Sequence, residues 1–158
     1  MLQRLQTVFL LVLVISMALI FIAPIWERTD AETGSVGRVS AMAVTVADSS
    51  GEVTETIPAI WIMVVAGMSV GIGVYSITQF KKRMVQIRLN FFNTLLILGT
   101  VALIYLYGLR AEGLIPGNGG QPWQWGFYLP FAALVMNSLA NRFIYRDEKM
   151  VREADRIR

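Results

Sequence analysis

The sequence contains neither cysteine nor histidine. Without cysteine there are no disulfide bonds or thiolate nucleophiles, and without histidine there are no imidazole bases and none of the usual ligands of zinc and haem. The common catalytic dyads and triads therefore cannot be assembled from this chain. We expect no catalytic residue, no cofactor and no metal site, and hence a protein that is not an enzyme.

Charged residues are scarce inside the long apolar stretches. The 158 residues are 55% hydrophobic and have a mean hydropathy of +0.56, which is above the average for soluble proteins. The length suits one domain, residues 1–158, with lipid as its main surrounding. Ion-coupled transporters place an ionisable side chain at mid-membrane depth, and no such residue is found here.

Four segments are apolar and long enough to cross a bilayer core of roughly 30 Å. They are residues 8–26, 58–80, 89–109 and 124–142. A signal peptide is the alternative for the first segment, but its apolar part would be shorter and would end at a small-residue cleavage site. The predicted fold is an all-α membrane protein, a bundle of four transmembrane helices.

Lysine and arginine are distributed unevenly between the two sides of this predicted bundle. Eleven of the fourteen lie before the first segment, at 81–88 or from residue 142 onward, whereas Arg28, Arg38 and Arg110 lie in the other loops. The positive-inside rule then puts both termini in the cytoplasm, with outer loops at 27–57 and 110–123. Membrane topology thus accounts for the net charge of +3 without a nucleic-acid partner.

The first outer loop contains the pattern of a small β-hairpin. Residues 38–47 are rich in valine and small residues, residues 48–51 have turn chemistry, and residues 52–56 would form the returning strand. The four tryptophans, which we expect at the outer ends of the helices as an aromatic belt, are Trp26, Trp61, Trp123 and Trp125.

The second segment carries small residues at helical spacing, namely Gly67, Ser69, Gly71 and Gly73. Such residues let helix backbones approach closely in membranes. We expect this face to pack against a neighbouring helix of the same bundle. A homodimer seam is the alternative.

Polar side chains gather near the cytoplasmic ends of three segments. This predicted inner-leaflet group consists of Ser76, Gln79, Asn90, Asn93, Asn137 and Asn141. Side-chain amides in lipid need hydrogen-bond partners, so the group predicts bonds between helices. The alternative is a polar pocket for a lipid head group, a quinone or another amphiphile.

The C-terminal tail, residues 143–158, predicts a cytoplasmic helix that continues the fourth segment. Its apolar residues recur at helical spacing, and they are Phe143, Met150, Val151, Ala154 and Ile157. Charged residues of both signs flank this stripe, which suits a protein surface. We expect the tail to dock on a partner; the alternative is a basic tail resting on anionic lipid.

Three stretches resemble a known family. They are the start at 1–7, the loop at 81–96 and the end at 140–158, where Arg146-Asp147-Glu148-Lys149-Met150-Val151-Arg152 is the most specific part. They are similar to the Bacteroidota inner-membrane family described as domain of unknown function 4293. The resemblance implies four transmembrane helices and a multi-pass protein of the bacterial inner membrane, and it implies no activity.

Two functions remain after these exclusions. The first is a non-catalytic accessory or scaffold subunit of a larger membrane assembly, which docks on inner-membrane or cytoplasmic proteins through its cytoplasmic face. The second is a binding or transfer protein for a lipid, quinone or other amphiphile. Membrane lipids are expected partners in both cases, and a homo-oligomer is compatible with either.

Overall fold

The computed structural model describes residues 2–80, 82–115 and 122–156, and the side chains of residues 5–80, 82–115 and 122–150. The described chain contains four helices and four strands. In chain order they are α1 (Leu2–Leu19), β1 (Trp26–Thr29), β2 (Val36–Val39), β3 (Ala43–Ala47), β4 (Val53–Pro58), α2 (Ile60–Thr78), α3 (Arg83–Leu114) and α4 (Trp125–Arg156).

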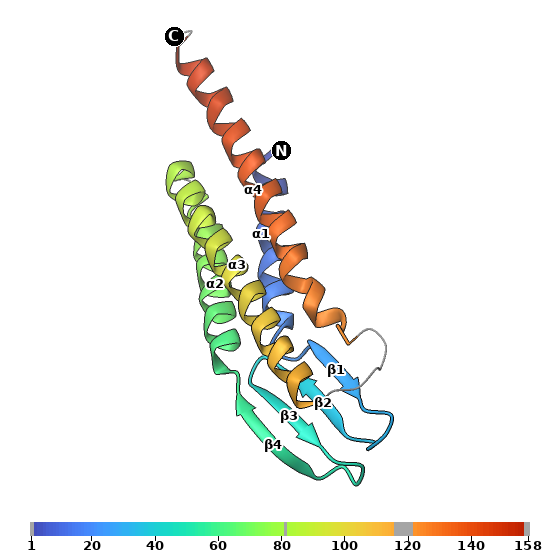
Figure 1. Ribbon diagram of the computed structural model, residues 1–158. Coiled ribbons are helices and arrows are strands. Elements are labelled where there is room, and N and C mark those ends of the chain that lie inside the picture. The colour runs from blue at the N-terminus through green and yellow to red at the C-terminus, as the bar shows by residue number, and fades with distance from the viewer. Residues whose placement is uncertain (1, 81, 116–121, 157–158) are drawn as a thin grey trace.

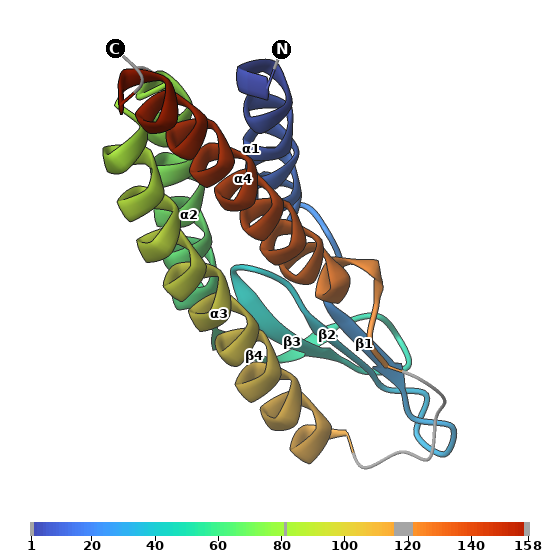
Figure 2. The same ribbon diagram turned by 90° about the horizontal axis from the view of Figure 1, so that it is seen from above.

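The helices stand side by side, with a β-sheet across one end of the group (Figure 1). α1 packs against α2 and α4, and α3 packs against the same two helices. The first residues of α1, the turn between α2 and α3, and the last residues of α4 all lie at the end away from the sheet (Figure 1, Figure 2).

The predicted all-α bundle of four transmembrane helices is wrong in two respects. The sheet has four antiparallel strands in the order β1-β2-β3-β4, where a small hairpin was expected. Among the described residues, only α2 and α3 are long and apolar enough to cross a membrane. α1 has a shorter apolar part, Leu5–Leu19, and α4 combines an apolar half with a charged half.

The first predicted span ends early because the chain leaves the helix before Pro24. The amide of Ala23 donates to the Leu19 carbonyl over 3.0 Å in the last turn, and the chain then becomes extended. Proline disfavours helical conformation in the residue before it and cannot itself donate to the helix. Trp26, which we expected at a helix end, therefore begins β1 and is buried.

The strands form a meander whose turns are set by polar side chains. The last turn lies at Asp48–Gly51, where the sequence predicts it, with the Gly51 amide donating to the Asp48 carbonyl over 3.0 Å. The preceding strand is broken, because the Ser40 hydroxyl oxygen accepts from the amides of Met42 and Ala43 at 3.3 and 3.2 Å. This turn separates β2 from β3 and converts the expected hairpin into part of a larger sheet.

Two aspartates hold the exposed turns at the far end of the sheet. Hydrogen bonds from the Thr33 hydroxyl and the Glu32 amide lower the pKa of the Asp30 carboxyl. Hydrogen bonds from the side chain and the amide of Ser50 do the same for the pKa of Asp48. These bonds favour the charged carboxylate in both turns.

The helices meet along faces on which buried residues recur at intervals of three or four positions. This spacing is typical of left-handed helix packing. The buried face of α3 is the longest, with Gln86, Asn90, Asn93, Ile97, Thr100, Ile104, Gly108 and Ala111. It is apolar or small toward the sheet and polar toward the other end.

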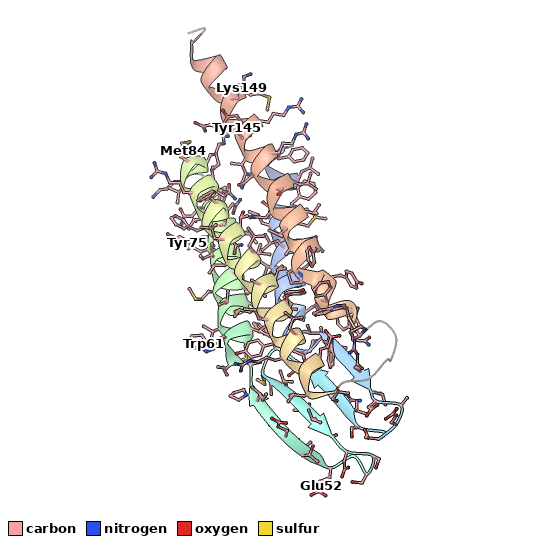
Figure 3. The ribbon with its side chains drawn as sticks, viewed as in Figure 1. Glu52, Trp61, Tyr75, Met84, Tyr145 and Lys149 are labelled. Atoms are coloured by element: carbon pink, nitrogen blue, oxygen red, sulfur yellow. The ribbon has the colours of Figure 1, made fainter. Side chains whose placement is uncertain are left out.

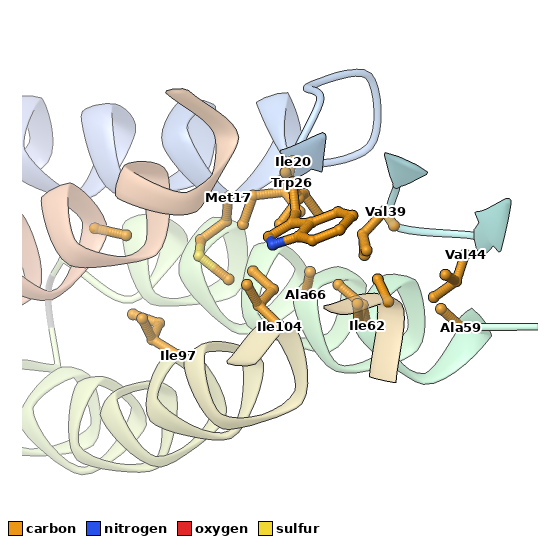
Figure 4. Close-up of a cluster of buried hydrophobic side chains, with 14 of the residues drawn as sticks. Met17, Ile20, Trp26, Val39, Val44, Ala59, Ile62, Ala66, Ile97 and Ile104 are labelled. Atoms are coloured by element: carbon orange, nitrogen blue, oxygen red, sulfur yellow. The ribbon is translucent and has the colours of Figure 1, made fainter. Parts of the chain in front are cut away.

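Trp26 joins the sheet to the helices (Figure 4). Its side chain is 1% exposed and lies among Met17, Ile20 and Ile104, while its backbone pairs with Val39 in β2. The end of α3 packs over β2 and β3, so the helix that forms a candidate span also supports the sheet.

Arg28 makes a second connection between the sheet and α3. Its guanidinium lies 3.0 Å from the Glu112 carboxylate and 5.6 Å from the centroid of the Trp26 ring. The Arg28 side chain is only 12% exposed, whereas that of Glu112 is half exposed. An ion pair of this kind orients the two elements more than it stabilises them.

Two glycines of α3 offer a matched test of this junction. A Cβ at Gly108 would lie 2.9 Å from Cζ3 of Trp123 and closer still to Cη2, whereas a Cβ at Gly113 would meet nothing within 4 Å. We expect Gly108→Ala to lower the free energy of unfolding by about 1–3 kcal/mol through overpacking. Gly113→Ala should be neutral or stabilise the helix by up to about 1 kcal/mol. Thermal unfolding in mild detergent measures both, and equal stability of the two variants would contradict this packing.

Candidate functional site: a buried amide cluster between three helices

Polar side chains from α2, α3 and α4 meet inside the helix group, in the half away from the sheet. We call this set the amide cluster, and its members are Ser76, Gln86, Asn90, Asn93, Thr94 and Asn137. All except Thr94 are at most 1% exposed. Their burial follows from the spacing described above, which turns the polar end of each helix face inward.

Asn90 lies at the centre of the cluster. Its Oδ1 accepts from the Ser76 hydroxyl over 2.7 Å, which joins α3 to α2. Its backbone carbonyl accepts from Nδ2 of Asn137 over 2.8 Å and from the Thr94 hydroxyl over 3.0 Å. Nδ2 of Asn137 also lies 2.8 Å from the Thr94 hydroxyl oxygen, so one amide group joins α4 to α3 twice.

Gln86 extends the cluster toward the turn between α2 and α3. Its Nε2 donates to the backbone carbonyl of Ser76 over 3.0 Å. The amide of Gln79 donates to the same carbonyl over 3.1 Å. These two donors satisfy the Ser76 carbonyl near the end of α2, where carbonyls lose their regular helical partners.

Several buried polar atoms of the cluster have no hydrogen-bond partner among the described residues. They are both side-chain polar atoms of Asn93, Nδ2 of Asn90, Oδ1 of Asn137 and Oε1 of Gln86. Both amide atoms of Gln6 on α1 are in the same condition. Each such atom costs about 1–3 kcal/mol when it stays unpaired. The cluster therefore has spare donors and acceptors that a polar ligand or water could use.

The chemistry available in the amide cluster is hydrogen bonding. Amide and hydroxyl side chains donate and accept, but they do not titrate near neutral pH. No Asp, Glu, Lys or Arg belongs to the cluster as the structure describes it. The arrangement can therefore hold helices together or bind a polar group, and it offers no acid or base.

The predicted inner-leaflet group is placed as follows. Ser76, Asn90 and Asn137 are joined by hydrogen bonds, and Asn93 is buried beside Gly73 without one. Asn141 is half-buried, with an unpartnered Oδ1. Gln79 caps α2 through its backbone and is not a member of the cluster.

Gln86 and Gln6 were missed by the sequence analysis. Gln86 lies four residues before Asn90 and seven before Asn93, so the spacing of three or four residues would have placed it on the same face. Gln6 lies four residues before the buried Leu10, and the same spacing would have found it. The sequence analysis did not determine which side of each helix faces inward, and that information was needed to place both glutamines.

The small residues of α2 lie on two different faces. Ser69 and Gly73 are buried, and a Cβ at Gly73 would lie 2.7 Å from Cγ2 of Val14 on α1. Gly67 is half-buried, with Phe21 at 3.8 Å from such a Cβ. Gly71 is exposed and has nothing within 4 Å, so the expectation that Gly71 touches another helix of the chain is wrong.

The described part of the predicted docking tail is anchored to the other helices. The Phe143 ring stacks on Phe9 of α1 at a centroid distance of 5.3 Å. Nε of Arg83 on α3 lies 2.9 Å from the Asp147 carboxylate, and its NH1 lies 3.9 Å from that of Glu148.

The remaining tail residues are less fully described. Met150 is 40% exposed. The side chains of Val151 and Ala154 and the whole of Ile157 lie outside the described residues.

Among the described residues, the fold combines two helices that are long and apolar enough to cross a membrane with a sheet at one end and the amide cluster toward the other. The chain belongs to the family described as domain of unknown function (DUF4293), whose profile matches residues 2–157. No match was found among curated proteins.

Asn137 and its neighbour Ser138 provide a test of the amide cluster. Asn137→Ala removes two hydrogen bonds between α4 and α3, so we expect the free energy of unfolding to fall by about 1–3 kcal/mol. Ser138 is exposed on the same helix, and Ser138→Ala should change little. The free energy of unfolding is measured in detergent. If neither substitution changed it, the amide cluster would not hold α4 in place.

Gly73 and Gly71 provide a test of the contact between α1 and α2. Both are helical, so replacement by alanine brings the same gain in helix propensity. Gly73→Ala would force Val14 and Leu13 to move and should destabilise the protein by about 1–3 kcal/mol. Gly71→Ala should not. The melting temperatures of the two variants in detergent test this. A larger fall in melting temperature for Gly71→Ala than for Gly73→Ala would mean that Gly71, not Gly73, lies on the packed face of α2.

Proposed function

We propose that this protein is a non-catalytic accessory or scaffold subunit of a larger assembly in the bacterial inner membrane. It docks on a membrane or cytoplasmic protein through the end of α4. The observation that carries the proposal is that α4 extends past the neighbouring helices at the end away from the sheet (Figure 1). A helix that projects from a packed group offers a surface that its own chain leaves uncovered.

Anchoring at its base supports the role of α4 as a docking arm. Arg83 contacts both Asp147 and Glu148, and Phe143 stacks on Phe9. These contacts fix the direction in which the helix leaves the group. A preorganised arm binds with less loss of conformational entropy than a flexible tail does.

A membrane location is supported by the distribution of side chains. Large apolar residues are exposed on the outer faces of the helices, such as Trp61 at 61% and Tyr75 at 53% (Figure 3). Asn90, by contrast, is fully buried. Soluble proteins show the opposite arrangement. In lipid it is favourable, because apolar side chains face hydrocarbon while polar ones are withdrawn from it and can bond to one another inside.

The orientation follows from the positive charges. Lys82, Arg83 and Arg88 lie at or near the turn between α2 and α3, while Arg142 and Arg146 lie in the charged half of α4. The positive-inside rule puts this end in the cytoplasm. α1 and α4 run beside α2 and α3 from the sheet to this same end (Figure 1), so the protein is multi-pass, with the sheet outside and both termini cytoplasmic.

A binding or transfer protein for a lipid, quinone or other amphiphile is the second candidate. The unpartnered buried atoms of Asn90, Asn93 and Asn137 favour it, because a polar head group could satisfy them. This function would use the amide cluster rather than the end of α4. A bound amphiphile seen by mass spectrometry after purification in mild detergent would favour it over docking.

The orientation is tested with single cysteines, since the chain has none of its own. Ser50→Cys lies in the exposed turn between β3 and β4, and Lys82→Cys lies in the turn between α2 and α3. An impermeant thiol reagent should label position 50 in intact spheroplasts, and position 82 only after lysis. Labelling of position 82 in intact spheroplasts would reverse the orientation.

The docking role is tested by removing residues 150–158. The truncated protein should still insert into the membrane, but the proteins that co-purify with the full chain should be lost. Met150→Glu should weaken the same co-purification, because it places a charge on the exposed arm. Met84→Glu is the matched control, since Met84 is 46% exposed at the same end but belongs to α3. An unchanged set of companions after truncation would end the docking proposal.

A further inference from the structure

A hollow lies on one face of α4, just before the projecting end of the helix. Its volume is about 250 Å³, and the described residues that line it are Leu139, Arg142, Phe143 and Arg146. These positions are three, four and seven residues apart, so they share one helix face. The two arginines stand one turn apart on this face.

Both arginines of the hollow are free to bind an anion. Arg142 and Arg146 are exposed, and neither makes an ion pair with any residue that the structure describes. The nearby acids of α4 do not neutralise them, because Asp147 and Glu148 contact Arg83 of α3. Within the part of the chain whose side chains are described, the two positive charges of the hollow therefore have no ion-pair partner.

The other half of the hollow is apolar and held in place. Leu139 is half-buried, and the Phe143 ring is fixed by its stacking on Phe9 of α1. Leu139 lies nearest the apolar half of α4, and Arg146 lies nearest its charged end. A ligand that matches both ends has an acyl chain and an anionic head.

We propose that this hollow binds the phosphate head group of an anionic phospholipid. Arg142 and Arg146 would hold the phosphate oxygens, since guanidinium groups pair with phosphate through parallel hydrogen bonds. Leu139 and Phe143 would contact the first part of the acyl chains. The inference rests on the proposed membrane location but requires no docking partner.

The test uses the full chain, purified in neutral detergent and titrated with phosphatidylglycerol or phosphatidylcholine, with bound lipid counted by native mass spectrometry. Phosphatidylglycerol should bind more tightly. Arg142→Gln together with Arg146→Gln should weaken that binding about 30-fold, or about fivefold for each cation removed. Lys82→Gln together with Arg88→Gln is the control, because it removes the same charge from exposed residues outside the hollow and should leave the affinity within about twofold.

Three results would overturn the proposal. Equal binding of the two lipids would show that the head group is not recognised. An equal loss of affinity for phosphatidylglycerol in the two double variants would indicate general attraction between the lipid and the basic end of the protein. Displacement of the lipid by millimolar inorganic phosphate would identify the free anion as the ligand. Co-purification of a partner is measured separately, so a variant that loses the lipid and keeps its companions separates this inference from the docking role.

Discussion

Side-chain amides buried among apolar helices must find their partners inside the chain, and this constraint determines how α2, α3 and α4 meet. Asn90 meets most of this requirement by joining three helices through bonds that involve Ser76, Thr94 and Asn137, although its own Nδ2 has no partner among the described residues. In lipid no water competes for these groups, so an amide that loses its partner has no substitute. The amide cluster therefore fixes the register of the helices at the end where the polar residues lie.

The opposite end depends on shape and aromatic packing. Trp26 occupies the space between the helices and the sheet, and Gly108 leaves room for Trp123 against α3. α3 contributes to both ends, with Asn90 in the amide cluster and Glu112 at the sheet. The helix is continuous from Arg83 to Leu114, so one element takes part in both kinds of packing.

The features that could be predicted from sequence are those set by local chemistry. The turn at Asp48–Gly51 follows from its own residue types, and the polar character of Asn90 and Asn137 required partners wherever the helices lay. The failures concern orientation. The apolar run up to Trp26 hid the strand that begins there, although Pro24 interrupts it. Hydropathy also does not show which side of a helix faces inward, so it could not distinguish the buried Gly73 from the exposed Gly71.

The central claim is that the outer surfaces of α2 and α3 face lipid while the amides face inward. It is tested most directly by spin labels at Val64→Cys on α2 and Leu98→Cys on α3, both exposed, with the protein in lipid nanodiscs. If these surfaces face lipid, the labels should collide often with oxygen, which dissolves in lipid, and rarely with a water-soluble nickel chelate. Ready access of the nickel chelate to both labels would mean that these faces contact water, and would contradict the account.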